Sequence, residues 1–199
     1  MVQPTPMFNQ PEIKILESQI RECFGRVVWT HKTHEKCSDI YAEQLKSLKT
    51  IEILLSAITT TTLLVTIFGD SKIAAIVAAI CSTIILVINI YTRDYDLGNL
   101  SKSHADVAGK LWNIRESYIS LLADIKIGSL TVDEIKLKRD GLQELLSLVY
   151  QNAPRTNFKA YEAASKALNK DGVINTGEEF TFIDEEIDRF LPQDLRRKN

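Results

Sequence analysis

Four hydroxyl side chains recur at spacings of three and four inside an uncharged apolar stretch of the sequence: Ser56, Thr59, Thr62 and Thr66. On a helix this spacing places them on one side. In a bilayer, small and hydroxylated side chains allow close helix approach and interhelical hydrogen bonds, which is packing within one molecule. The alternative is that several copies assemble and the hydroxyl groups line a pore. Both interpretations stay open at this point.

Two further polar residues, Glu52 and Asn89, bracket the apolar region. If the chain folds back near position 70, they lie opposite each other at the membrane boundary. A ring of Glu52 carboxylates favours cations at a pore mouth, and the alternative is an interfacial carboxylate that reaches water. The pore-lining candidates are Glu52, Ser56, Thr59, Thr62, Thr66 and Asn89. The helix-packing candidates are Ala75, Ala79 and Thr83, beside a neighbouring ridge of Ala74, Ala78 and Ser82.

A histidine and cysteine group also draws attention: His31, His34, Cys37 and, by the same fold-back, His104. These are zinc-ligand types, but their spacing follows no established zinc pattern. We therefore predict helix packing, with no metal and no cofactor. The sequence contains no nucleophile elbow, no phosphate-binding glycine loop and no His-Glu-x-x-His motif, so we predict that the chain is not an enzyme.

The elements that carry these residues are two uncharged runs, residues 53–69 and 73–91, separated by a short turn with Asp70 and Lys72. As helices they are about 25 and 28 Å long, close to the ~30 Å hydrocarbon core of a bilayer. We predict an all-α membrane protein with a transmembrane helical hairpin. The alternative is a soluble helical bundle with this hairpin as its core.

Beyond the hairpin, apolar residues alternate at spacings of three and four, which is the heptad pattern of packed helices. This predicted stalk seam consists of Leu97, Leu100, His104, Val107, Leu111, Ile114, Tyr118, Leu121 and Ile125. The hairpin is thus expected to continue as a long antiparallel helical stalk. A dimer seam satisfies these heptads as well as a ring does.

Residues typical of helix starts and ends divide the remaining chain into further helices. Pro11 suits a helix start, and Gly25 suggests an interruption. Thr131 and Glu134 form a capping box, Pro154 follows a helix end, and one more helix is expected over 156–169 with a short one in the tail. The predicted divisions are a flexible lead-in (1–11), N-terminal cytoplasmic helices (12–50), the hairpin (51–92), the heptad helix (93–128) and a C-terminal helical region (129–199).

Charge and cysteine usage indicate where the chain resides. Net charge is −2, which gives no support for direct nucleic-acid binding. The three cysteines form no disulfide framework, as expected of reduced cytosolic thiols. The positive-inside rule places both termini in the cytoplasm and the turn outside. The flanking basic residues behind this orientation are Lys46, Lys49, Arg93 and Lys102.

A cytoplasmic helix is followed by two short spans and a long helical return. This order of elements resembles the SLATT family over about residues 12–192, and so do the segments 29–36 (WTHKTHEK), 91–95 (YTRDY) and 177–192 (GEEFTFIDEEIDRFLP). The family consists of two-span bacterial proteins found beside SLOG nucleotide-sensing domains and enzymes that make nucleotide second messengers. The tail is similar to the branch often encoded next to reverse transcriptases.

The resemblance implies an antiphage effector at the bacterial inner membrane, without catalytic residues. A sensor would trigger assembly or opening, the membrane would leak, and growth of the infected cell would stop (abortive infection). The implied partners are further copies of the chain, the lipid bilayer, and a sensor (a reverse transcriptase, a nucleotide-producing enzyme or a SLOG protein) or a nucleotide ligand. The alternative is a non-conducting membrane anchor that recruits a cytosolic partner.

Overall fold

The computed structural model describes residues 10–69, 71–168 and 182–197, and in these ranges every regular element is a helix. The helices are α1 (Gln10–Gly69), α2 (Lys72–Tyr95), α3 (Leu97–Ile127), α4 (Val132–Gln151), α5 (Phe158–Leu168) and α6 (Asp184–Asp188), followed by the 3₁₀ turn η1 (Gln193–Leu195). The all-α prediction is confirmed. The predictions made for residues 1–9, Asp70, 169–181 and 198–199 lie outside the described residues.

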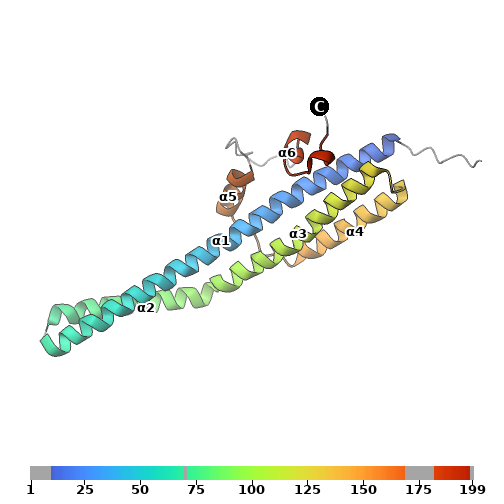
Figure 1. Ribbon diagram of the computed structural model, residues 1–199. Helices are drawn as coiled ribbons and strands as arrows, with labels where there is room; N and C mark the ends of the chain where they lie inside the picture. Colours follow the sequence, from blue (N-terminus) through green and yellow to red (C-terminus); the bar gives the residue numbers. More distant parts are fainter. Residues whose placement is uncertain (1–9, 70, 169–181, 198–199) are drawn as a thin grey trace, which may run out of the picture. The chain divides into compact units, whose positions relative to one another are not determined.

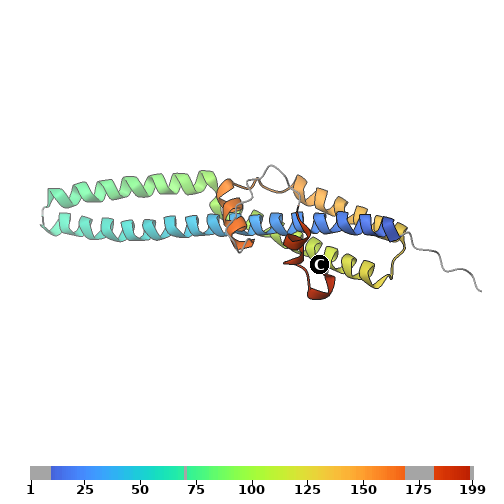
Figure 2. The same cartoon turned by 90° about the horizontal axis from the view of Figure 1, so that it is seen from above.

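The chain forms two compact units. The hairpin unit is Cys37–Ser103, and the helical body is Met1–Lys36 together with His104–Asn199. In the hairpin unit, α1 and α2 lie side by side in both views (Figures 1 and 2). Both contain stretches long and apolar enough to cross a membrane.

The surface of the hairpin decides between the membrane and soluble interpretations. The most apolar window of the first span is 0% buried, and Phe68 and Ile73 are 86% and 76% exposed. The core helices of a soluble bundle would bury such side chains. The hairpin is therefore no soluble core, and two helices with apolar outer faces are what lipid requires.

The ends of α2 are defined by local hydrogen bonds. The Ser71 hydroxyl accepts a hydrogen bond from the Ala74 amide at 3.4 Å, which caps the N-terminus of α2. At the other end Asp96 adopts a left-handed conformation (φ 35°), and its carboxylate accepts a hydrogen bond from the Asn99 amide at 3.2 Å. Aspartate tolerates this backbone region and caps helices well, so the chain breaks between α2 and α3 at Asp96. The helix predicted to continue from the hairpin into the stalk is therefore interrupted at this residue.

The interruption expected near Gly25 does not occur, because α1 runs from Gln10 to Gly69. Gly25 is buried, and a Cβ atom built on it would lie 3.0 Å from the Phe182 ring and 3.4 Å from Ile187. This glycine therefore allows the C-terminal segment to approach α1 closely. It does not end the helix.

In the helical body, α1 lies between α3 and α4 on one side and α5 and α6 on the other (Figure 1). The α3–α4 connection contains Gly128, with φ +76°, and the Thr131–Glu134 capping box, which is confirmed. The Thr131 amide donates to the Glu134 carboxylate at 2.7 Å, and the Glu134 amide donates to the Thr131 hydroxyl at 3.3 Å. One continuous apolar core joins α1, α3, α4 and the C-terminal segment.

Candidate functional site

The predicted pore-lining residues of the first span divide into two groups. Glu52, Thr59, Thr62 and Thr66 are half-buried and share one stripe of α1. Because α2 lies alongside α1 (Figure 2), the half-burial of this stripe indicates that it faces the partner helix of the hairpin. Ser56, in contrast, is exposed. In a single hairpin three of the four predicted hydroxyl residues therefore lie along the helix–helix contact.

The hydroxyl groups of this stripe are already hydrogen-bonded within their own helix. Thr59 donates to the Leu55 carbonyl at 2.8 Å, and Thr66 donates to the Thr62 carbonyl at 2.8 Å. Thr62 does the same with the Ile58 carbonyl at 2.9 Å. Such back-bonding satisfies the donor without any neighbouring helix. The stripe therefore needs no polar partner from α2.

On α2 the buried face consists of Ala74, Ala78, Cys81 and Ile88. This is the ridge next to the one predicted for packing, since Ala75 is half-buried while Ala79 and Thr83 are exposed. Both ridges carry small residues, so composition alone does not choose between them. The predicted set Ala75, Ala79 and Thr83 stays a prediction for contacts made outside the hairpin.

The exposed small and polar residues gather on one flank of the hairpin. On a projection of about 100° per residue, Ser56 and Thr60 lie to one side of the half-buried stripe of α1. Ala75 and Ala79, together with Ser82 and Asn89, lie to the corresponding side of the buried face of α2, whereas Thr83 lies opposite that face. Because the helices are antiparallel, these sides form one flank. We name it the polar flank. Its polar members are Ser56, Thr60, Ser82 and Asn89, all exposed, and the exposed Leu63, Ile67 and Leu86 lie on the same flank.

Ser82 and Asn89 differ from the other polar residues of the polar flank. Their side chains make no hydrogen bond within the described part of the chain, whereas the Ser56 and Thr60 hydroxyls donate to carbonyls of α1. An exposed amide at the edge of an apolar span is costly in lipid unless water or another helix supplies a partner. At the membrane boundary, where the sequence places Asn89, this partner is either water or a neighbouring helix.

The predicted stalk seam lies on the inner side of α3. Within the helical body its members from His104 to Ile125 are all buried, and in the hairpin unit Leu97 is buried and Leu100 is half-buried. His104, Leu111 and Tyr118 are 0% exposed. The seam side chains of the helical body pack into the core of a single chain, so their burial by itself requires no second copy.

Two histidines meet inside the helical body. The Nδ1 atoms of His34 and His104 lie 2.8 Å apart, and both residues are buried. Burial, followed by the neighbouring His104 and His31, lowers the pKa of His34 to about 4. Burial likewise lowers the pKa of His104 and of His31. Among the described residues no group of three or more His, Cys, Asp or Glu side chains is arranged to hold a metal ion.

Arg21 is a charged residue of the helical body that sequence reasoning missed. It is 1% exposed, and its guanidinium forms ion pairs with Asp184 and Asp188 of α6. It also donates to the Leu195 carbonyl at 3.1 Å. Arg197 in turn donates to Asp184 at 2.6 Å. This cluster fastens the C-terminal segment to α1, and only the i, i+4 spacing of the two aspartates hinted at it.

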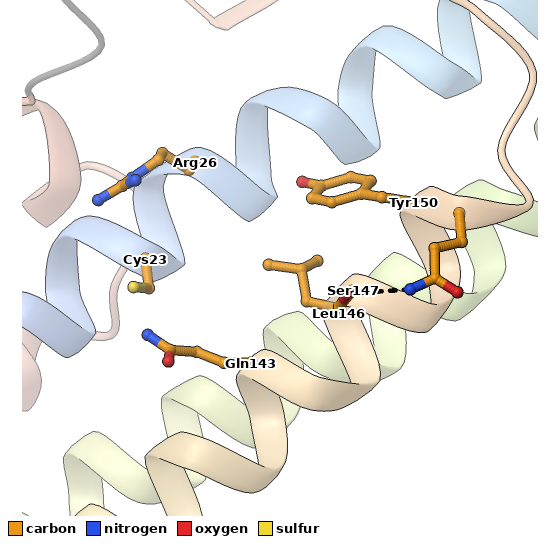
Figure 3. Close-up of a pocket in the computed structure, with 7 residues that line it drawn as sticks. Cys23, Arg26, Gln143, Leu146, Ser147 and Tyr150 are labelled. Carbon is orange, nitrogen blue, oxygen red and sulfur yellow. Dashed lines mark hydrogen bonds between the residues drawn. The ribbon is translucent and has the colours of Figure 1, made fainter.

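An open cavity of about 560 Å³ lies between α1 and α4 (Figure 3). Its walls include Cys23 and Arg26 from α1 and Leu146 and Tyr150 from α4. The Arg26 guanidinium is held by Glu22 at 3.0 Å, so its charge is compensated. The cavity combines an apolar wall with a few polar groups, which suits a small ligand in general terms.

Comparison with known proteins agrees with this architecture. The profile of the SMODS and SLOG-associating 2TM effector domain family 4 matches residues 16–186, which include both spans and most of the helical body. No curated protein and no solved structure matches the chain. The matched region covers most of the chain, and its two spans are those of the hairpin unit. The chain therefore belongs to the SMODS and SLOG-associating two-transmembrane effector domain family 4.

Proposed function

We propose that this chain is a homo-oligomeric effector of a bacterial antiphage system that permeabilises the inner membrane when a sensor activates it. The family is one of two-transmembrane effectors linked to conflict systems, which supports the effector role. The observation that carries the permeabilising role is the polar flank, where the exposed Ser82 and Asn89 side chains have no hydrogen-bond partner within the described residues.

Two helices cannot enclose a channel, so conduction requires several copies. In a ring, each hairpin would turn its polar flank inward and its large aliphatic side chains toward lipid. Ile76, Ile80 and Val87, which lie on the far side of α2, are 60%, 56% and 60% exposed and suit a lipid-facing surface. Asn89 would then meet water or the neighbouring copy, which removes its desolvation cost.

In this ring, only some of the predicted pore-lining residues would face the lumen. Ser56 and Asn89 would face the lumen directly. Thr59, Thr62 and Thr66 would line it only if the hairpin opened between α1 and α2, because they are half-buried against α2 in the present arrangement. Glu52, on the same half-buried stripe, would lie at the cytoplasmic mouth.

Activation would act on the helical body, with both termini in the cytoplasm. A sensor protein (a reverse transcriptase, a nucleotide-producing enzyme or a SLOG protein) or a nucleotide ligand would bias the assembly between two arrangements. A ligand with no preference between those arrangements would not shift the equilibrium.

The test is dye leakage from liposomes that contain the purified full chain, with and without the neighbouring sensor. The flank variant is Ser56→Leu/Thr60→Leu/Asn89→Leu, and the stripe variant is Thr59→Leu/Thr62→Leu/Thr66→Leu. Thr61→Leu is the matched control, since Thr61 is exposed on the opposite side of α1. We expect the flank variant to lose leakage at unchanged oligomer mass, while Thr61→Leu keeps it.

Other outcomes point elsewhere. Loss of dye leakage in the stripe variant alone would place the conducting path between α1 and α2. Leakage that survives in all variants would mean general bilayer disruption in place of a pore. An absence of leakage from the wild type with its sensor present would contradict the proposal.

One observation favours the alternative of a non-conducting anchor. The hydroxyls of Ser56 and of all five threonines of the first span donate to carbonyls of α1 itself, so the span is stable in lipid without a water-filled lumen. An anchor predicts that neither the flank variant nor the stripe variant changes function in cells.

A further inference from the structure

The cavity between α1 and α4 has walls built by both helices. Its volume of about 560 Å³ is within the range of sites that bind small molecules. Tyr150 of α4 forms part of the wall, and its hydroxyl donates to the Thr30 hydroxyl of α1 at 3.3 Å, which holds the ring in place. Leu146 adds an apolar surface, and Gln143 points from α4 toward Cys23 of α1 (Figure 3). The cavity is therefore shaped by side chains of the helical body alone.

A buried hydroxyl group lies behind this wall. Tyr118 of α3 is 0% exposed, and its hydroxyl makes no hydrogen bond of good geometry within the described residues. The side chains that act on this hydroxyl are Cys23 first, then Tyr150 and Arg26, and all three line the cavity. Burial, followed by the Cys23 thiol, raises the pKa of Tyr118, so the hydroxyl keeps its proton and can donate it in a hydrogen bond. Sulfur is a weak acceptor, so the thiol does not satisfy this donor.

An unpaired donor of this kind is unusual. Native proteins pair nearly all buried polar groups with protein, ordered water or a ligand, and an exception often marks a place where such a partner binds. Tyr118 is separated from the cavity by Cys23, whose side chain has a single rotatable bond. A turn of Cys23 to another rotamer would bring the Tyr118 hydroxyl into contact with the cavity. The cavity and the unpaired donor therefore point to one site.

The charges and amides of the cavity favour an uncharged ligand. Among the described residues that line it, Arg26 carries the only charge, and Glu22 already pairs with it at 3.0 Å. A phosphate or carboxylate would have to displace Glu22, and a cation would meet no carboxylate on the wall. Gln143 makes no hydrogen bond within the described part of the chain. Its amide can both donate and accept, which suits a second amide.

We propose that this cavity binds a small uncharged molecule that carries a ring and a carboxamide or lactam group. The ring packs against Tyr150 and Leu146. The carboxamide pairs with the amide of Gln143, and its carbonyl oxygen accepts a hydrogen bond from the Tyr118 hydroxyl once the Cys23 side chain has turned aside. Such a ligand contacts α1, α3 and α4 together. Its binding involves the helical body alone and does not depend on whether the hairpin conducts.

The experiment uses the full chain in phosphatidylcholine nanodiscs and 4-fluorobenzamide as the probe, with binding followed by fluorine NMR. The blocking variant is Ser147→Trp, which fills the cavity from an exposed position on α4 and so leaves the core intact. Leu148→Trp is the matched control, since it introduces the same ring at the next exposed position, which does not line the cavity. Empty nanodiscs give the background from lipid. We expect the wild type and Leu148→Trp to bind the probe at least tenfold more tightly than Ser147→Trp does.

Tyr118→Phe tests the buried hydroxyl itself. Because this hydroxyl is unpaired in the unliganded chain, its removal should leave the thermal unfolding temperature unchanged or raise it. We expect the variant to bind the probe at least fivefold more weakly, as the loss of one hydrogen bond implies. A lower unfolding temperature with unchanged binding would give the hydroxyl a structural role and would overturn the proposed contact.

The charged analogue 4-fluorobenzoate tests the class of ligand. We expect it to bind the wild type at least tenfold more weakly than 4-fluorobenzamide, because Glu22 holds the Arg26 guanidinium. Equal or tighter binding of the benzoate would overturn the proposal, since Arg26 would then be the anchor of an anion site. Equal binding of the benzamide by the wild type and Ser147→Trp, or binding no greater than that of empty nanodiscs, would also overturn it.

Discussion

The Nδ1 atoms of His34 in α1 and His104 in α3 face each other at 2.8 Å inside the helical body. One nitrogen must donate and the other accept, so the pair holds one proton between the two facing atoms and both rings stay neutral. Protonation of both rings would place two donors and two positive charges face to face. His31 is the other titratable group whose charge acts on His34, and Glu35, Arg115 and Lys32 act in turn on His31.

This pair predicts an acid-sensitive helical body. The pKa of His34 falls from 6.5 to about 4 on folding, so between these values the unfolded chain binds a proton that the folded chain does not. Stability is therefore complete above pH 6.5 and is lost as the pH falls toward 4, by about 2 kcal/mol at pH 5 for His34 alone. The measurement is chemical unfolding followed by tryptophan fluorescence at pH 7 and pH 5.

The matched variant is His34→Gln/His104→Gln, which keeps polar side chains that do not titrate. Carboxylates contribute equally to the pH dependence of both proteins. The difference between the two proteins in how the free energy of unfolding changes with pH therefore reports the histidines alone. We expect the variant to lose less stability than the wild type between pH 7 and pH 5. Identical losses would show that the pair does not govern the acid response.

The ion pairs of Arg21 give a second prediction. Arg21→Ala would remove the buried cation that pairs with Asp184 and Asp188. Asp184 is part-exposed and keeps its pair with Arg197, so the cost is set by Asp188 and is about 1–3 kcal/mol. We expect a large drop in the free energy of unfolding and faster hydrogen exchange in α6. Arg139→Ala, which removes an ion pair with the exposed Asp140, should cost less than about 1 kcal/mol. Equal costs would refute the role assigned to Arg21.

The contrast between Arg21 and the stalk seam shows what sequence patterns disclose. Seam residues such as Leu111 and Ile114 are apolar at a regular period, so the buried side of α3 could be read from the chain alone. Arg21 meets partners 163 and 167 positions away, and no local period marks such contacts. Burial of a charge is visible only once the tertiary partner is placed.

The hairpin shows a second feature that sequence alone does not determine, which is the choice of the packed face of α2. Its two spans and its small-residue faces follow from composition, because lipid imposes length and apolarity on each helix separately. The choice between the Ala74–Ala78 ridge and the Ala75–Ala79 ridge depends on the partner helix, and the two ridges carry the same residues. Gly25 likewise suggested a break, because the close approach of Phe182 could not be foreseen.

Three glycines provide a third prediction with opposite signs. Gly128 has φ +76°, where any Cβ atom is strained, so Gly128→Ala should cost about 1 kcal/mol. Gly25→Ala should also destabilise, because its Cβ atom would lie 3.0 Å from Phe182. Gly141 is helical and a Cβ atom built on it meets nothing within 4 Å, so Gly141→Ala should instead stabilise by up to about 1 kcal/mol. Thermal unfolding of the three variants checks the order, and a destabilised Gly141→Ala would contradict the open space found there.

The orientation of the hairpin is the fourth prediction. Lys46 and Lys49 precede the first span, and the positive-inside rule then places the turn outside and α5 in the cytoplasm. In a chain with Cys23→Ser, Cys37→Ala and Cys81→Ala, a cysteine at position 72 should react with a membrane-impermeant maleimide in intact spheroplasts. A cysteine in place of the exposed Lys166 should react only after lysis. The reverse pattern would invert the topology, and reaction of both sites in intact cells would argue against stable insertion of the hairpin.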